Sequence, residues 1–296
     1  MLARRLALAT AALTFCLMVL GGVVHATESS LACPDWPTCH GEWMPELVGG
    51  VLFEHSHRML GALVGVFTLA LALAAWRRGG ALRAAGLGAV ALVIAQGILG
   101  GLTVVLELPP PVSTAHLATA FAFLSLLLWL ARQGAPRVLA PEPVARWAGL
   151  AGVLVFSQCV LGAMVRHTDA GTACGVDPVT CAGLWLPGWD LGRLQMLHRA
   201  AALGVGLVVI VTSVVTLRAR ACRALWPLAI GASLLVLAQV GLGVASVTSA
   251  LETWTVTLHL GAGVASFACV VWLRLRVVHA GELDAPDEVT ARPIAA

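Results

Sequence analysis

Long apolar runs of helical length alternate with short polar segments along the 296-residue chain. A helix needs about 20 apolar residues to cross the hydrocarbon core of a bilayer, and only helices and closed barrels satisfy their backbone hydrogen bonds there. The pattern therefore predicts an all-α integral membrane protein with eight transmembrane helices. The expected spans are residues 6–25, 55–76, 84–106, 112–131, 145–166, 195–217, 224–248 and 252–274.

The composition supports the same class of protein. Hydrophobic residues make up 59% of the chain and charged residues only 11%, whereas about 25% of the residues of a soluble domain are charged. These values exclude a soluble globular protein, a disordered chain, a nucleic-acid-binding protein and a small secreted disulfide-rich protein. The lipid bilayer is the expected partner of the apolar surface, and no nucleic-acid partner is expected.

The arginines are distributed unequally between the two sides of the predicted spans. Thirteen flank one side and four flank the other, and the chain has no lysine. By the positive-inside rule the richer side is cytoplasmic. We therefore expect a multi-pass protein of the cell membrane, with both termini in the cytoplasm and the long loops at about 26–53 and 167–194 outside. The four outer arginines are Arg58, Arg166, Arg193 and Arg199.

The two halves of the chain repeat the same features at an offset of 141 to 143 residues. Leu20–Cys33 reads LGGVVHATESSLAC, and Leu161–Cys174 reads LGAMVRHTDAGTAC. Because a unit of four spans restores the original orientation, we expect two tandem, pseudo-symmetric four-helix bundles arranged as parallel repeats, with cofactor pockets between facing helices. The expected domains are 1–140 and 141–278, followed by a cytoplasmic tail at 279–296.

The first apolar run has a second interpretation. Arg4 and Arg5 followed by apolar residues are also typical of a cleaved signal peptide. The repeat pairs this run with an internal span, however, and so favours a retained helix.

Four histidines, His57, His116, His198 and His259, each lie about four residues into a predicted span that starts at the outer face. Ionisable groups inside a membrane are costly and indicate functional sites. Two imidazoles at equal depth on different helices suit axial ligation of a planar iron macrocycle such as haem. The alternative is a set of core histidines that donate hydrogen bonds to carbonyl groups. Zinc fits less well, because the ligands come in pairs about 60 residues apart.

One position differs between the halves. Glu54 lies three residues before His57 on the same helical face, whereas the residue that corresponds to it before His198 is Gln195. A carboxylate beside only one pocket suggests chemistry in the first half and a permanent cofactor in the second. Glu54 would accept a proton or stabilise positive charge; the alternative is a carboxylate favoured by the dipole of a helix start.

Other polar residues lie near the predicted ligands. Arg58 and Arg199 follow a histidine directly and are candidate partners of haem propionates, or else extend to lipid headgroups. His55 is offset by two residues from His57 and is expected to face elsewhere. Gln96 and Gln239 recur in spans 3 and 7 and are expected to form hydrogen bonds within the bundles or to line the pockets.

Each long outer loop carries two cysteines. Because the extracytoplasmic side is oxidising, we expect disulfides between Cys33 and Cys39 and between Cys174 and Cys181. A structural role is the simplest for both. A redox-active role is the alternative for the first, which lies in the half that carries Glu54.

Taken together, these residues resemble the haem A synthase family, in the bacterial type that carries cysteine pairs in both outer loops. The resemblance covers nearly the whole chain. It rests on eight spans in two halves, on Glu54-x-x-His57-Arg58, His116, His198-Arg199 and His259, and on the C-P-D-W-P-x-C loop.

The resemblance implies an oxidoreductase that oxidises a ring methyl of haem O to a formyl group, giving haem A for cytochrome oxidase. His198 and His259 would ligate the iron of a resident haem b. His57 and His116 would bind the substrate haem, with Glu54 catalytic. A membrane quinol or another donor would supply electrons, and haem O synthase, cytochrome oxidase and a second copy of the chain are candidate partners.

Two other functions use part of the same pattern. A dihaem cytochrome b that oxidises quinol needs the four histidines but not Glu54. A transporter built from parallel repeats needs no haem.

Overall fold

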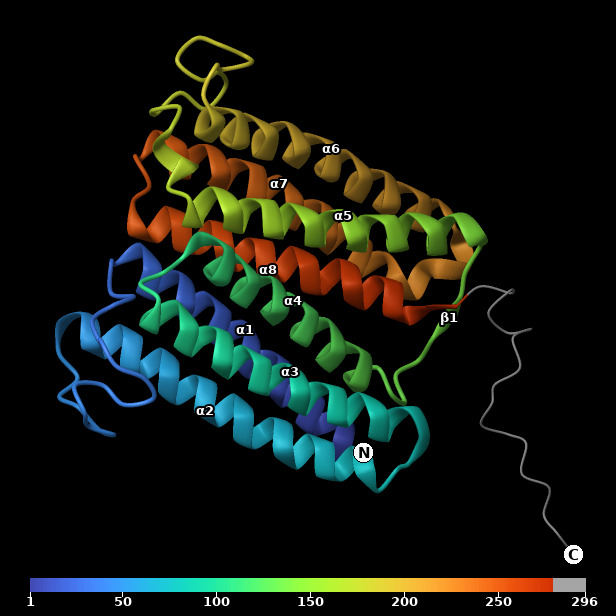
Figure 1. Ribbon diagram of the computed structural model, residues 1–296. Coiled ribbons are helices and arrows are strands. Elements are labelled where there is room, and N and C mark those ends of the chain that lie inside the picture. Colours follow the sequence, from blue (N-terminus) through green and yellow to red (C-terminus); the bar gives the residue numbers. More distant parts are fainter. Residues whose placement is uncertain (279–296) are drawn as a thin grey trace, which may run out of the picture.

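The computed structural model describes residues 1–278. Within this range the chain forms eight helices that are long and apolar enough to cross a membrane, as the hydropathy pattern predicts (Figure 1). The expected tail at 279–296 lies outside the described residues. The helices are α1 (Leu2–Ala26), α2 (Gly49–Trp76), α3 (Gly80–Val105), α4 (Pro110–Ala131), α5 (Glu142–His167), α6 (Asp190–Arg218), α7 (Trp226–Thr248) and α8 (Thr253–Arg276).

Proline and glycine set several of the helix boundaries. Pro110 is the first residue of α4, and Pro143 and Pro227 are the second residues of α5 and α7. Proline suits these places because the first N–H groups of a helix have no partner within it. Gly79 and Gly80 connect α2 to α3 with φ angles of 71° and 52°, which side chains with a Cβ rarely adopt.

The helices pack as two four-helix bundles. In α1–α4 and again in α5–α8, each helix packs against two neighbours, and the bundles meet where α1 contacts α8 and where α4 contacts α5 and α8. At this interface Phe121 of α4 packs edge-on against Phe267 of α8, with ring centroids 5.0 Å apart. The two long loops lie at one end of the molecule, and the N-terminus lies at the other (Figure 1).

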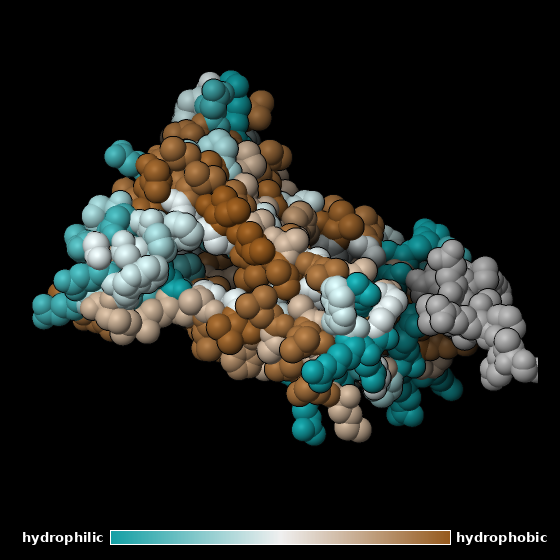
Figure 2. Space-filling view, turned by 60° about the horizontal axis from the view of Figure 1, so that its bottom comes forward, coloured by the Kyte–Doolittle hydropathy of each residue, from teal (hydrophilic) through white to brown (hydrophobic). Residues whose placement is uncertain are grey.

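The lateral surface is strongly apolar. Figure 2 shows hydrophobic side chains across the middle of the molecule, between more hydrophilic regions at the two ends. Large exposed residues of this surface include Val66 and Leu69 on α2 and Ile94 and Ile98 on α3. Such an apolar surface suits contact with lipid tails.

Four short elements are not part of the sequence-based prediction. They are the 3-10 helices η1 (Ala170–Thr172) and η2 (Arg220–Leu225) and a parallel pair of two-residue strands, β1 (Val138–Leu139) and β2 (Val277–Val278). The strands tie the linker between the bundles to the end of α8, where the N–H of Ala140 also donates to the carbonyl of Val278 at 2.8 Å.

Candidate functional site

A cavity of about 2220 Å³ reaches into both bundles. Its walls include His57 and His116 from the first bundle and His198 and His259 from the second. Within each pair the imidazoles lie close enough to interact electrostatically. The structure therefore brings the four histidines together as two pairs, one in each bundle, and their role as iron ligands stays a prediction.

Three of the four helices that carry these histidines, α2, α4 and α6, begin earlier than hydropathy predicts, whereas α8 begins one residue later. His57 and His198 each lie eight residues after the first residue of α2 and α6, and His116 and His259 each lie six residues after the first residue of α4 and α8. Counted from the helix starts, the histidines therefore lie six to eight residues in, compared with about four residues into the predicted spans. At 1.5 Å of rise per residue, the difference is roughly 3–6 Å along the helix.

Each of these imidazoles packs against a glycine of a neighbouring helix. A Cβ added to Gly21 would lie 3.0 Å from Cε1 of His57, and one added to Gly162 would lie 3.0 Å from Cε1 of His198. Gly100 and Gly243 face His116 and His259 in the same way, at 3.3 and 3.2 Å. These glycines occupy repeated positions, and a side chain at any of them would press against an imidazole ring.

Glutamine amides hold several of the histidines. Gln158 of α5 places Nε2 3.0 Å from Nδ1 of His198 and donates to the carbonyl of that residue at 3.0 Å. Gln96 donates to the carbonyl of His116 at 2.8 Å. The amide Nε2 of Gln239 lies 3.5 Å from the ring of His259. A partner on one ring nitrogen fixes the ring and leaves the other nitrogen free for a metal.

The donor set suits a ligand in the cavity. The buried Nδ1 atoms of His57, His116 and His259 have no hydrogen-bond partner among residues 1–278, and an unsatisfied buried polar atom is costly. Neutral imidazoles in an apolar cavity are typical axial ligands of haem iron. These residues therefore fit a haem in each bundle.

Glu54 is buried beside the first pair and forms an ion pair with Arg58. Its Oε1 lies 2.5 Å from Nη2 of Arg58, and its Oε2 accepts a hydrogen bond from the backbone N–H of Cys33 at 2.8 Å. In the second half, Gln195 only donates to the carbonyl of Gly171, at 3.3 Å. The asymmetry that the sequence predicts is therefore present as a difference in charge and in hydrogen bonding.

Arg58 and Arg199, the candidate propionate partners, both hold an outer loop. Arg58 donates to the carbonyls of Cys33, Asp35 and Thr38. Arg199 donates to the carbonyls of Asp177 and Thr180, at 2.9 and 3.0 Å, and these residues correspond to Asp35 and Thr38 in the repeat. Nε and Nη2 of Arg199 have no partner among the described residues, so Arg199, unlike Arg58, keeps buried donors free.

Both predicted disulfides are present. Cys33 and Cys39 are joined, as are Cys174 and Cys181. Between the first two, the carboxylate of Asp35 accepts hydrogen bonds from the hydroxyl of Thr38 and the N–H groups of Gly41 and His40. These bonds, that of Thr38 foremost, lower the pKa of Asp35 to about 2.

His55 is a residue whose position the sequence does not reveal. It is buried, and one of its ring nitrogens and the sulfur atoms of Cys33 and Cys39 lie within 4.8 Å of one another. It lines the same cavity as His57. Gln158 is likewise missed, because its counterpart in the first half is the apolar Leu17.

Comparison with known proteins identifies the family. The COX15-CtaA family of cytochrome oxidase assembly proteins matches residues 4–49, 46–195 and 192–295. A haem A synthase of Shouchella clausii (strain KSM-K16) is 31% identical over 274 residues, which cover 87% of this chain and 89% of that protein. A haem A synthase of Halalkalibacterium halodurans is 31% identical over 260 residues, 82% of this chain and 86% of the relative. A haem A synthase of Methylobacterium radiotolerans is 30% identical over 306 aligned positions, which cover 84% of this chain and 83% of that protein. The chain therefore belongs to the haem A synthase family.

Proposed function

We propose that this protein converts haem O to haem A by oxidising a ring methyl to a formyl group in its first half, with a resident haem b in its second half. The observation that carries the division of labour is the buried ion pair between Glu54 and Arg58 beside His57. Beside His198, Gln195 takes the place of Glu54, so the corresponding carboxylate is missing. Membership of the family supports an enzyme of haem A biosynthesis. The ring and backbone contacts of Gln158 to His198 support a histidine held in place for a permanent ligand.

The resident haem, when bound, supplies one-electron redox chemistry. His198 and His259 would hold it from opposite helices of the second bundle. His57 and His116 would hold the iron of the substrate. Conversion of the methyl to a formyl group removes four electrons, so an oxidant is required. Dioxygen would act as the oxidant after one of these histidines leaves the substrate iron, with the donor supplying the further electrons that reduce it; alternatively, water would supply the oxygen atom and an electron acceptor would take the four electrons.

Glu54 would act as the proton acceptor in either route. Oxidation of a methyl to a formyl group breaks two C–H bonds, so a base beside the ring favours the reaction. The guanidinium of Arg58 and the N–H of Cys33 each bind one carboxylate oxygen and fix its direction. Glu54 is 4% exposed and lines the cavity, so bulk water has little access to it.

The placement in the cell is part of this proposal. The protein would lie in the cell membrane with its termini in the cytoplasm and both cysteine loops outside, where oxidising conditions favour the disulfides. Haem O synthase would supply the substrate, cytochrome oxidase would receive the product, and a membrane quinol or another donor would supply electrons.

Co-expression with a haem O synthase, in a host that makes no haem A, tests the function. Haem A should appear in the extracted haems, as a species that has gained one oxygen and lost two hydrogens relative to haem O. The host with haem O synthase alone is the control. Unchanged haem O, together with two reducible b-type haems in the purified protein, would instead favour an electron-transfer cytochrome.

A further inference from the structure

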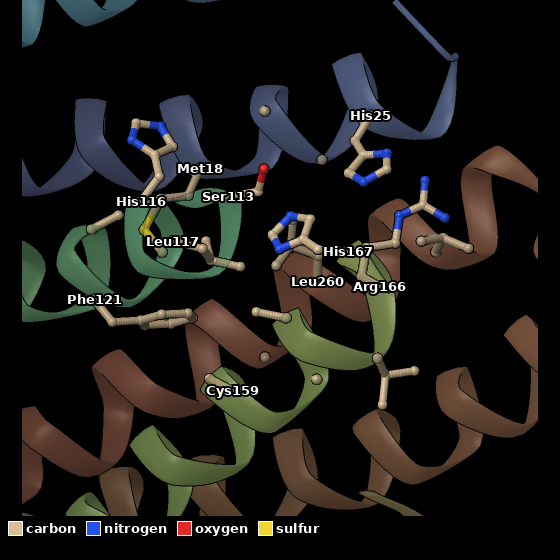
Figure 3. A pocket seen from close by; sticks show the side chains of 18 of the residues that line it. Met18, His25, Ser113, His116, Leu117, Phe121, Cys159, Arg166, His167 and Leu260 are labelled. Carbon is tan, nitrogen blue, oxygen red and sulfur yellow. The ribbon is translucent and has the colours of Figure 1, made fainter. Parts of the chain in front are cut away.

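A polar cluster lies at the outer part of the interface between the bundles, and neither haem ligation nor the outer loops account for it. His25 lies in the last turn of α1, and Arg166 and His167 are the last two residues of α5; we call these three residues the interface cluster. All three line the cavity, as does Ser113 of α4 (Figure 3). The rings of His25 and His167 stack with centroids 5.4 Å apart and planes 9° from parallel, which joins one bundle to the other.

Arg166 is a half-buried cation without a direct partner. Its guanidinium forms no hydrogen bond or ion pair with any residue of 1–278, and the carboxylates of Glu28 and Asp169 act on it only from beyond ion-pair distance. By contrast, Arg58 is paired with Glu54, and Arg193, also in the cavity wall, binds backbone carbonyls. A partly desolvated charge is costly without a counter-ion, so Arg166 is suited to an anion within the cavity.

The position of Arg166 relates it to the second pair of histidines. It lies one helical turn outward from Gly162, on the same side of α5, and Gly162 packs against the ring of His198. Arg166 is therefore at the outer edge of the pocket that His198 lines. His25 holds the corresponding place in the first half, one turn beyond Gly21.

His167 reaches across the interface. Its Nδ1 lies 3.2 Å from the hydroxyl of Thr114 on α4, and it also interacts electrostatically with His116 and His25. When the hydroxyl occupies Nδ1, the second ring nitrogen is free to donate a hydrogen bond. The buried hydroxyl of Ser113, close by on α4, has no partner among the described residues. Several unused donors thus converge on one part of the cavity.

We propose that the interface cluster is a carboxylate-binding site that takes a propionate of a bound haem. Arg166 pairs with the carboxylate, since guanidinium groups bind carboxylates through two parallel hydrogen bonds, and His167 and His25 add donors from each side of the interface. The inference rests on the proposed function, because it requires a haem in the cavity. The resident and the substrate haem carry the same carboxylates, and the place of Arg166 beyond Gly162 favours the resident haem.

Titration with haem b and with its dimethyl ester tests this site. The ester has the same ring and iron but no carboxylate charge. The full-length protein would be purified from haem-deficient cells, and binding followed by the Soret absorbance. Two backgrounds separate the pockets: His57→Ala leaves only the second pair intact, and His198→Ala leaves only the first. Each background is then combined with Arg166→Gln, Arg166→Lys or the control Arg193→Gln.

We expect the His57→Ala protein to bind the free acid roughly tenfold or more tightly than the ester, the size typical of a hydrogen bond to a charged group. Arg166→Gln should remove this preference by weakening only the free acid, Arg166→Lys should keep part of it, and Arg193→Gln should keep all of it. A preference that depends on Arg166 only in the His198→Ala background would support the site but assign it to the substrate haem.

Two results would overturn the proposal. In the first, Arg166→Gln weakens binding of haem b and of its dimethyl ester by the same factor. In the second, Arg166→Gln binds both compounds as tightly as its parent protein does. Failure of the parent proteins to bind any haem would instead contradict the proposed function, so the two failures are distinguishable.

Discussion

The backbone N–H of Cys33 donates a hydrogen bond to Oε2 of Glu54 at 2.8 Å, which connects the first disulfide loop directly to the candidate catalytic carboxylate. Arg58 strengthens the connection, because it binds both the carbonyl of Cys33 and the other carboxylate oxygen. The loop, the cation and the acid therefore form one unit. The second half has the disulfide and the arginine but lacks the acid.

Replacing Glu54 by glutamine should stop haem conversion while leaving the fold and the resident haem intact. The amide retains the size of the side chain but cannot accept a proton, and loss of a general base typically costs about 10²-fold or more in rate. Haem A formed in cells that make haem O is the measurement, and Gln195→Ala, at the corresponding position, is the control. Wild-type haem A output from Glu54→Gln would remove this residue from the mechanism.

The two pairs of histidines should respond differently to substitution. His198→Ala and His259→Ala should each remove the resident haem, since each would remove one of its two proposed iron ligands. His57→Ala and His116→Ala should keep that haem and lose binding of the substrate. Pyridine haemochrome spectra of the purified variants measure the resident haem. Full haem content in both second-half variants would contradict the assignment.

Gly162 should tolerate no side chain. The Cβ of Gly162→Ala would lie 3.0 Å from the ring of His198, so the imidazole would have to shift by a few tenths of an ångström. We expect reduced affinity for the resident haem and an altered low-spin spectrum. Gly152→Ala on the same helix is the matched control, because a Cβ there meets no atom within 4 Å. Equal spectra for the two variants would argue against this role of the glycine.

The cysteines should divide into two sets under alkylation. The outer loops hold four in disulfides, and Cys16, Cys159, Cys222 and Cys269 are free. Denatured, unreduced protein should therefore take up four alkyl groups and reduced protein eight, as measured by intact mass. Eight groups before reduction would show that the outer loops are not cross-linked.

Acid should destabilise the first outer loop through Asp35. Its pKa is lowered from 3.8 to about 2, first by the hydroxyl of Thr38 and then by the N–H groups of Gly41 and His40. The folded state therefore binds this proton less readily than the unfolded state, so the stabilisation is present above about pH 4 and is lost as the pH falls toward 2. The midpoint temperature of thermal unfolding, followed by tryptophan fluorescence at pH 5, 4 and 3, should fall more steeply with decreasing pH for the wild type than for Asp35→Asn. Parallel curves would contradict this origin.

The fold is largely predictable from sequence because apolar length specifies a membrane helix. The repeat also predicts which histidines pair, since corresponding residues must occupy corresponding places. The helix starts are less predictable. Gly49 to Phe53 precede the predicted second span but belong to α2, because a helix continues into the polar boundary wherever its backbone bonds can form.

The contacts of the site are less predictable than its residues. Nothing in the sequence tells that Arg58 binds loop carbonyls or that Gln158 reaches His198, because both contacts depend on how segments far apart in the chain pack. The β1–β2 pair was missed for a similar reason: two-residue strands 139 positions apart leave no periodic pattern. His25 and Arg166 did leave a signal, as polar residues at the same place in both repeats.

One cavity reaches the histidine pairs of both bundles, so we expect ligands bound in the two bundles to influence each other. Residues of α1, α4, α5 and α8 border the space between the two pairs of histidines. A ligand that orders these residues in one bundle would therefore change the surface that a ligand in the other bundle contacts. Thermodynamic linkage makes such an influence mutual and of equal size in both directions. Binding of a haem in the second bundle should therefore change the affinity of the first bundle for its substrate. Exchange of substrate for product in the first bundle should likewise change the affinity of the second bundle for its haem.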